Sequence, residues 1–262
     1  MRRYFSLFWI QLRASLLLSM QYRAEFLIEG VSSLFWGLTS LVPLYAVYGR
    51  RDAIGGWPMG ESLVVLAFFL LLKNLIEGTV NPSLLRVVEQ IRQGTLDFVL
   101  LKPADAQFLV STAKFDPSAS LGILSAFAMF GVAFTKLGHA PGAKGFLLAL
   151  VLLAAAVVLV YSIWIVVISA AFYVVRVDNL AYLFTSVFDA ARWPVTVFKG
   201  ALGLFFTFVI PLGLMTTYPA VALLGRLEWP MVLGSLGFTL LFAYGARRVW
   251  RHALSRYTSA SS

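Results

Sequence analysis

Five stretches of this chain contain no charged residue, and each is long enough to cross a lipid bilayer as a helix. They comprise residues 30–49, 117–135, 145–175, 200–225 and 229–246. A helical crossing needs about 20 predominantly apolar residues. A sixth stretch, residues 61–85, contains Lys73 and Glu77 in its interior, but the residues around them are apolar enough for insertion. The chain is therefore predicted to cross a membrane six times.

The composition excludes a water-soluble globular domain. Charged residues make up 13% of the chain, and the mean hydropathy is +0.85, whereas soluble domains contain about 25% charged residues. The formal net charge is +9. In so apolar a chain, Lys and Arg mark cytoplasmic helix ends and contacts with membrane lipid rather than with nucleic acid. Cysteine is absent, which excludes disulfides and thiolate metal sites.

We predict an all-α integral membrane protein: a single transmembrane domain with six transmembrane helices, an N-terminal interfacial helix and a re-entrant helical hairpin before the last span. In residues 1–23, Phe5, Phe8 and Leu12 recur at helical spacing, which indicates a helix lying flat on the membrane. Arg13 interrupts the apolar core that a cleaved signal peptide would need. The expected spans are 24–49, 61–85, 117–137, 145–175, 179–193 and 229–250, with the outer hairpin at 195–225 and a cytoplasmic coupling segment at 86–116.

The stretch between residues 176 and 228 needs an odd number of crossings, but it is long for one span and short for three. Prolines interrupt any continuous helix there, and non-helical backbone at membrane depth must lie inside protein or beside water. A fifth span at 179–193 followed by a hairpin from the outer face fits best. A fifth span at 199–218, with 178–192 as a surface helix, stays an alternative. The residues expected to shape the hairpin are Arg192, Pro194, Pro211 and Pro219.

Lys and Arg also set the expected orientation. They are more numerous near the span ends on the side of the N-terminus. By the positive-inside rule, both termini are therefore expected in the cytoplasm.

The segment between the second and third spans, residues 86–116, is polar on its outside. A short helix is stopped by Gly94 and followed by the apolar run LDFVLL and by Lys102-Pro103. From the residues alone, two interpretations stay open: a knob that docks on a soluble partner, or an amphipathic helix held at the lipid headgroups. The residues expected to carry a docking role are Arg86, Glu89, Gln90, Arg92 and Gly94.

Residues 91–103 read IRQGTLDFVLLKP. This run resembles the I-R-x-G-x-L-D-x-x-L-x-K-P signature of ABC-2-type permeases, the membrane subunits of a class of ABC exporters, in their bacterial six-span branch. That branch also has A-R-x-P, P-L-G/A and Y-P-A further on. This chain has them in the same order, at residues 191–194, 211–213 and 218–220. One departure is Trp193, where the branch often has Tyr.

The resemblance implies a half-transporter of the bacterial plasma membrane that works as a dimer, with a second copy or with a related permease. ATP and Mg²⁺ would be bound by a separate ATP-binding subunit, and residues 86–93 would form a coupling helix in a groove of that subunit. Independently of the resemblance, the chain contains no G-x-x-x-x-G-K-[ST] phosphate loop. No cofactor is therefore expected on this chain.

Lys73 and Glu77 stand four residues apart inside the second span, with Asn74 beside them and Glu29 near the start of the first span. Intramembrane charges usually pair, and they face protein or water. Two interpretations stay open: a structural pair that fixes helix packing, or part of a translocation path. Further along, Asp189 shares a helix face with Arg192 and is expected to brace the hairpin.

No enzymatic or metal chemistry is indicated. His139 and His252 fall on opposite sides of the membrane in the predicted topology, and no Ser/His/Asp grouping is evident. The leading hypothesis is the permease of an ATP-driven exporter. The alternative is an ATP-independent secondary transporter or channel, which Lys73 and Glu77 would support. The transported substrate stays open.

Overall fold

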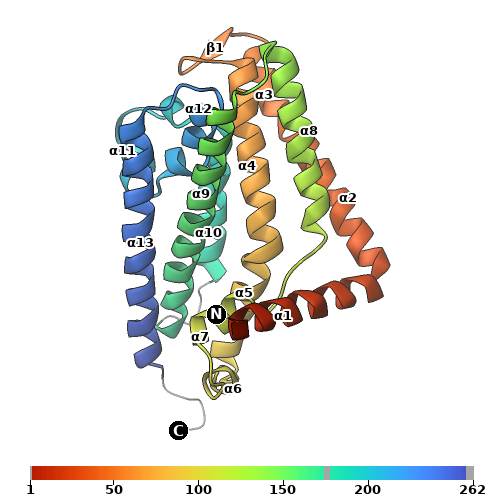
Figure 1. The fold of residues 1–262 in the computed structure, drawn as a ribbon, viewed down its shortest axis with the longest axis vertical. Coiled ribbons are helices and arrows are strands. Elements are labelled where there is room, and N and C mark those ends of the chain that lie inside the picture. Colours follow the sequence, from red (N-terminus) through yellow and green to blue (C-terminus); the bar gives the residue numbers. More distant parts are fainter. Residues whose placement is uncertain (1, 174–177, 258–262) are drawn as a thin grey trace.

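The computed structural model describes residues 2–173 and 178–257, and these are almost entirely helical (Figure 1). The α-helices are α1 (Arg2–Gln21), α2 (Arg23–Thr39), α3 (Leu41–Tyr48), α4 (Met59–Thr79), α5 (Asn81–Arg92), α6 (Asp97–Leu100), α7 (Ala106–Ser111), α8 (Ala119–Leu137), α9 (Ala143–Ser169), α10 (Asp178–Phe188), α11 (Gly200–Phe208), α12 (Tyr218–Leu223) and α13 (Trp229–Ser255). Short 3-10 turns are η1 (Ala170–Phe172), η2 (Asp189–Arg192) and η3 (Val195–Val197), and η4 (Gly213–Thr217) is a π-helical turn. Strands β1 (Ala53–Ile54) and β2 (Trp57–Pro58) form one antiparallel hairpin.

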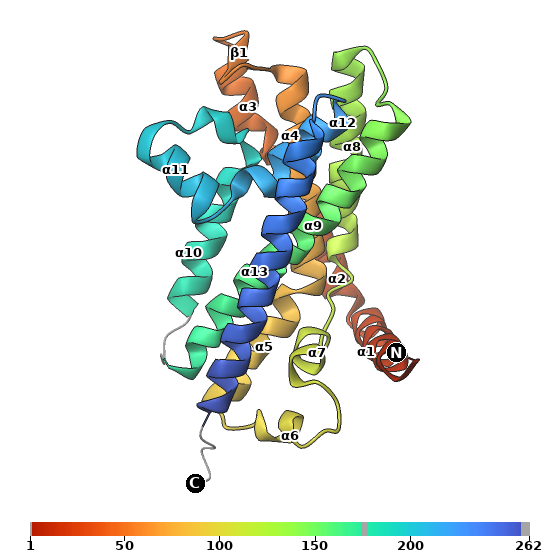
Figure 2. The same cartoon turned by 60° about the vertical axis from the view of Figure 1, so that its left-hand side comes forward.

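The helices form an upright bundle with two different ends (Figures 1 and 2). The β1–β2 hairpin lies at one end, called here the hairpin end. The start of α1, the end of α13 and the short helices α6 and α7 lie at the other, the termini end. There α1 leaves the bundle and meets α2 at a sharp elbow, and it exposes large apolar side chains such as Phe5 and Ile10.

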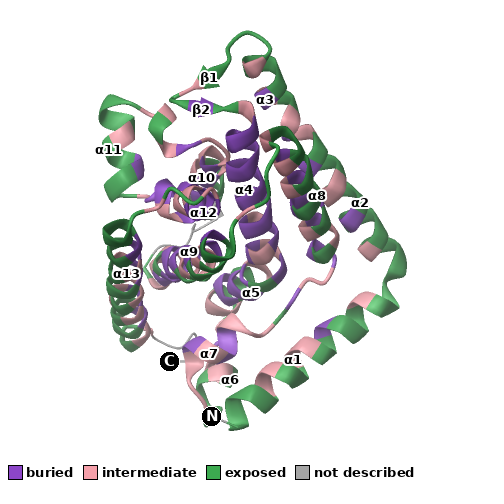
Figure 3. Cartoon of the chain, turned by 45° about the horizontal axis from the view of Figure 1, so that its top comes forward, coloured by how far each residue is buried: buried purple, intermediate pink, exposed green. Residues whose placement is uncertain are grey.

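The central helix of the bundle is α4. In its most apolar window 83% of the residues are buried, compared with 22% for α2–α3 and 22% for α13. It packs mainly against α8 and also against α9, and its buried surface is visible along its length in Figure 3. A helix that is apolar on every side, as residues 63–72 are, is stable when protein or lipid surrounds it completely.

Within the described residues, five helical segments are long and apolar enough to cross a membrane. They are Arg23–Tyr48, Met59–Thr79, Ala119–Leu137, Ala143–Phe172 and Trp229–Ser255. A sixth is added if Gly200–Phe208 and Gly213–Leu223, which are bent by 66° relative to each other, count as one span. The all-α membrane architecture expected from the sequence is therefore confirmed.

The second predicted span ends earlier in the structure, and the fifth contains an α-helix too short to cross a bilayer by itself. The second span is predicted to reach residue 85, whereas α4 ends at Thr79 and α5 begins at Asn81. Pro82 follows at once, and proline fits the first turn of a helix but not its interior, so a new helix starts there. The predicted fifth span, residues 179–193, coincides with α10 and η2. The 11 residues of α10 extend about 16 Å, about half of a hydrocarbon core.

The helices α2, α4 and α8 approach one another closely at Gly122. A β-carbon at this position would lie 1.7 Å from Asn74 Oδ1 and 2.2 Å from Ser33 Oγ. The Ser33 hydroxyl donates to Asn74 Oδ1 at 2.9 Å, and Asn74 Nδ2 donates to the Leu70 carbonyl at 2.7 Å. A buried amide is thus hydrogen-bonded at the point where three helices meet, and a small residue permits their approach.

Gly122→Ala should therefore destabilise the protein, because the added methyl group must displace Asn74 or Ser33. Overpacking of this kind typically costs about 1–3 kcal/mol. Gly131→Ala in the same helix is the matched control, because nothing lies within 4 Å of its added β-carbon. We expect the thermal unfolding midpoint of the purified protein in detergent to be lower for Gly122→Ala than for Gly131→Ala. Equal midpoints would contradict the packing argument.

Candidate functional site

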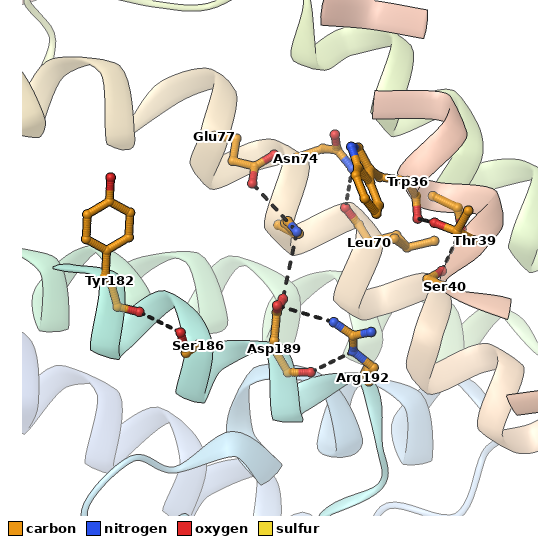
Figure 4. A network of polar contacts seen from close by, with 12 residues as sticks. Trp36, Thr39, Ser40, Leu70, Asn74, Glu77, Tyr182, Ser186, Asp189 and Arg192 are labelled. Carbon is orange, nitrogen blue, oxygen red and sulfur yellow. Dashed lines mark hydrogen bonds and ion pairs between the residues drawn. The ribbon is translucent and has the colours of Figure 1, made fainter. Parts of the chain in front are cut away.

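Two charged pairs that are far apart in the sequence meet beside α4 (Figure 4). Lys73 Nζ lies 3.9 Å from Glu77 Oε1 and 3.7 Å from Asp189 Oδ1. Arg192 Nη2 lies 3.3 Å from Asp189 Oδ2, and Arg192 Nε donates to the Asp189 carbonyl at 2.9 Å. Both cations lie over the ring of Phe69, 5.9 Å and 5.4 Å from its centroid. The ammonium group thus stands between two carboxylates, one of which it shares with a guanidinium.

Local backbone structure brings these charges together. Side chains four residues apart lie on one face of a helix, so Lys73 and Glu77 project from α4 side by side. The turn η2 ends at Arg192, and Pro194 prevents the helix from continuing. Asp189 therefore faces α4 from a turn between two helical segments. The sequence predicts each pair, but not their meeting.

The cluster lines a cavity of about 1000 Å³ between α2, α4, η2 and the residues before α8. All four intramembrane polar residues singled out in the sequence line it: Glu29, Lys73, Asn74 and Glu77. The structure adds Trp36, Asp116, Asp189 and Arg192. Four carboxylates and two cations thus face the cavity. Within residues 2–173 and 178–257, no three His, Cys, Asp or Glu side chains are grouped so that they could hold a metal ion.

At the termini end, α5 carries the residues expected to dock a partner. Its apolar face is buried through Leu84, Val87 and Val88. Glu89 and Arg92 are exposed and form an ion pair at 3.7 Å. Gly94, with a φ of +69°, follows the end of α5, a conformation that favours glycine. Arg86 and Gln90 line a separate, small cavity next to α1 and α7.

Comparison with known proteins identifies the family. The family described as ABC-2 family transporter protein matches residues 34–261, most of the chain. The chain belongs to this family. No curated protein and no solved structure matches it. This ABC-2 transporter protein is therefore a multi-pass membrane protein and the permease of an ABC transporter, as the resemblance implies, and its family typically works with an ATP-binding subunit.

In this ABC-2 transporter protein, two of the residues expected to shape the outer hairpin, Pro194 and Pro211, lie between short helices. Arg192 is the last residue of η2, and Pro219 lies in the first turn of α12, which continues directly from η4. Hydrogen bonds attach the later part of this region to η2 and η3. The Thr216 hydroxyl donates to the Ala191 carbonyl at 2.7 Å, and the Val195 N–H donates to Thr217 Oγ1 at 3.0 Å. The region from η2 to α12 is therefore one packed unit.

This unit is fastened to the hairpin end of the molecule. Trp57 Nε1 donates to Thr196 Oγ1 at 3.0 Å, and Thr196 Oγ1 donates to the Gly55 carbonyl at 3.0 Å. Just before α13, Arg226 donates two hydrogen bonds to Glu61 at the start of α4, at 2.8 Å and 2.6 Å. Residues 196 and 226 therefore both lie at the hairpin end.

A second ionic network of the ABC-2 transporter protein, not found from the sequence, joins four helices at the termini end. Arg247 in α13 donates two hydrogen bonds to the carboxylate of Asp105 and one to the side chain of Gln107. Gln107 donates to the Tyr161 hydroxyl in α9 at 2.9 Å, and the Asp105 N–H donates to the Tyr4 hydroxyl in α1 at 3.2 Å. An Asp before a helix is a recognisable N-cap signal. Its arginine partner, far along the chain, leaves no local signal.

Lys73→Met should reduce the amount of folded protein several-fold, because Glu77 and Asp189 lose the cation between them. An uncompensated charge at membrane depth costs about 2.5–3.5 kcal/mol on insertion scales. Adding Glu77→Gln should restore most of the loss, because Asp189 keeps Arg192. The amount of folded protein in both variants is measured by size-exclusion chromatography of a fluorescent fusion. Lys199→Met, at an exposed lysine, is the control. The pairing is wrong if the single and double variants are equally abundant.

Asp105→Asn should destabilise the protein at neutral pH but not in acid. The hydrogen bonds from Arg247 lower the pKa of Asp105 below its ordinary value. Such a carboxylate stabilises the folded state above its unfolded-state pKa of about 3.9, and this stabilisation is lost as the pH falls through the lower folded-state value. The difference in unfolding midpoint between wild type and variant should thus be present at pH 7 and shrink below about pH 4. A difference independent of pH would contradict this.

Proposed function

We propose that this chain is the permease subunit of an ATP-driven ABC exporter, in which two permeases form the translocation path and a separate subunit hydrolyses ATP. The observation that carries the proposal is the direct connection of α4 to α5. Lys73 and Glu77 line the large cavity within two turns of the end of α4. One residue later α5 begins, with its exposed Glu89–Arg92 pair. A subunit that binds α5 would therefore move the end of α4 and the cavity wall with it.

The exposed end of α5 suits a soluble protein partner. Its polar side chains can form charge-assisted hydrogen bonds across an interface. The coupling surface comprises Glu89, Gln90, Arg92 and Gly94, with Arg86 at its margin. The termini end then lies on the cytoplasmic side of a bacterial inner membrane, the orientation that the distribution of Lys and Arg favours. The α1 helix lies at the lipid headgroups, and the partner holds ATP and Mg²⁺.

The positions of residues 173, 196 and 226 support six crossings. The described chain leaves α9 and η1 at the termini end at Tyr173, whereas Thr196 is bonded to the β-hairpin at the hairpin end. The fifth crossing thus falls between these two residues and combines α10 with η2 and the extended residues after it. Arg226, which follows α12, is again at the hairpin end. This supports a re-entrant hairpin at 195–225 over a span at 199–218.

A second permease, identical or related, is expected to lie against α2. This helix exposes the large apolar side chains of Val31, Phe35, Trp36 and Leu38, and Val42 in the following helix α3 is exposed too. The large cavity lies along the same helix and includes Trp36 in its wall. A second copy would cover these side chains and separate the cavity from lipid. Closure of the ATP-binding subunits would draw the two α5 helices together, and release of Thr196 from the β-hairpin would open the opposite end.

An ATP-independent secondary transporter is the second candidate. It is favoured by one observation, the group Lys73, Glu77 and Asp189 on the cavity wall, since intramembrane carboxylates and cations mark ion and proton relays. The two candidates differ in whether transport depends on α5 and an ATPase.

The charge-exchange variant Glu89→Arg with Arg92→Glu should separate them. It keeps the ion pair within α5 and therefore the fold, but it reverses the charges presented to a partner. Truncating or reversing a buried interfacial charge pair costs about 2–5 kcal/mol, so the amount of ATP-binding subunit recovered with the permease should fall at least tenfold. Transport-dependent ATP hydrolysis should be lost.

The matched control exchanges charges at the opposite end, Arg50→Asp with Asp52→Arg, both exposed. It should keep the ATP-binding subunit. If the α5 variant inserts normally, still binds the ATP-binding subunit and still transports at the normal rate, the coupling role is wrong.

A further inference from the structure

A small cavity of about 160 Å³ lies between α1, α5 and the stretch around α6 and α7. Four polar side chains line it, from three separate segments: Gln11, Arg86, Gln90 and Lys102. Its remaining wall is apolar and consists of Val99, Leu109, Val110 and Ala113. The cavity is smaller than the roughly 300–1000 Å³ of sites for drug-sized ligands. It has the size of a headgroup rather than of a whole transported molecule.

The polar groups of this cavity are donors without matching anions. No carboxylate lines it, and among the described residues neither Arg86 nor Lys102 has an ion-pair partner. The nearest carboxylate on α5, that of Glu89, is engaged by Arg92 and by the Gln93 amide. Two like charges facing one cavity repel each other. An anion between them would remove this repulsion and accept charge-assisted hydrogen bonds from both.

The amide of Gln11 adds to this donor set. The Thr112 hydroxyl donates to the amide oxygen of Gln11, Oε1, at 2.6 Å. This bond engages the oxygen of the Gln11 amide. Its two N–H groups have no hydrogen-bond partner among residues 2–173 and 178–257. The cavity therefore combines a guanidinium, an ammonium and amide N–H groups, the donors that phosphate oxygens accept from.

The position of α1 indicates which anion can reach this cavity. It exposes Phe5, Trp9 and Ile10, with 59–71% of each side chain accessible, and it carries Arg3 and Arg13. A helix with this combination lies in the interface between headgroups and acyl chains. Gln11, in the middle of α1, brings the cavity to the same depth.

We propose that this cavity binds the phosphate of an anionic phospholipid, with the acyl chains along the exposed apolar side of α1. The lipid then bridges α1 and α5, so that α5 is held from the membrane side as well as by α4. The proposal needs only the membrane location of the chain and stands without an ATP-binding partner. It commits to a lipid phosphate rather than to a free one, because only a lipid also gains from the apolar side chains of α1.

Binding is measured on the purified permease alone, in neutral detergent, by microscale thermophoresis. The three probes are dioleoyl phosphatidylglycerol, dioleoyl phosphatidylcholine and inorganic phosphate. Wild type should prefer phosphatidylglycerol to the other two. Arg86→Gln with Lys102→Gln should weaken phosphatidylglycerol binding on the order of thirtyfold, if each of the two cations contributes as much to the affinity as one Lys or Arg near an anionic lipid surface. Arg50→Gln with Arg51→Gln, the same charge change in exposed residues at the hairpin end, should weaken it less than threefold.

Three results would overturn the proposal. Equal losses of phosphatidylglycerol affinity in the two double variants would mean that the lipid responds to surface charge in general and not to this cavity. Inorganic phosphate bound as tightly as phosphatidylglycerol would mean a free-anion site. Unchanged lipid affinity in Arg86→Gln with Lys102→Gln, together with loss of the ATP-binding subunit, would assign the cavity to a protein interface. Should that variant not fold, Arg86→Gln alone against Arg86→Lys gives the same comparison, with the lysine variant retaining affinity.

Discussion

Lys73 is held between two carboxylates, one from its own helix and one from a turn more than a hundred residues later. Such charges are tolerated at membrane depth only when they are paired and face protein or water. The pairing requires η2 to approach α4, and the chain changes from the α-helix α10 to the 3-10 turn η2 at this point. The wall of the cavity and the packing of η2 against α4 therefore meet at the same contact.

The cavity and the proposed coupling surface are connected through one short piece of backbone. The helix α4 is packed against α8 and α9 and mostly buried, so in the proposed mechanism it would transmit a displacement along its length rather than bend. Its last two turns carry the charges of the cavity wall, and α5 follows at once. The chain between α4 and α8 begins with α5. Further along this connection, the network around Asp105 and Arg247 attaches it to α1, α9 and α13. The segment between α4 and α8 is thus held at both ends.

Features that are encoded locally could be predicted from the sequence, and features made by distant contacts could not. Hydropathy predicts the long helices because each must match the bilayer within its own residues. The predicted fifth span does not follow this rule, because residues 179–193 form a short helix and a 3-10 turn rather than one long helix. The pair Lys73 and Glu77 follows from helical spacing, whereas its meeting with Asp189 does not. For the same reason Glu29 and Asn74 are predicted as polar residues of a membrane helix, but only the fold shows that they face one cavity.

The uncharged part of the last helix, α13, is fixed by an arginine on each side: Arg226 just before the helix binds Glu61, and Arg247 within it binds Asp105. Between them lies the run 229–246, of which only 22% is buried and which extends about 27 Å as a helix. A helix held at both ends cannot adjust its tilt freely to the thickness of the surrounding lipid. The bilayer must then adapt to the protein, which sets a preferred hydrophobic thickness close to this length. Two ionic contacts thereby define the membrane in which the molecule is least strained.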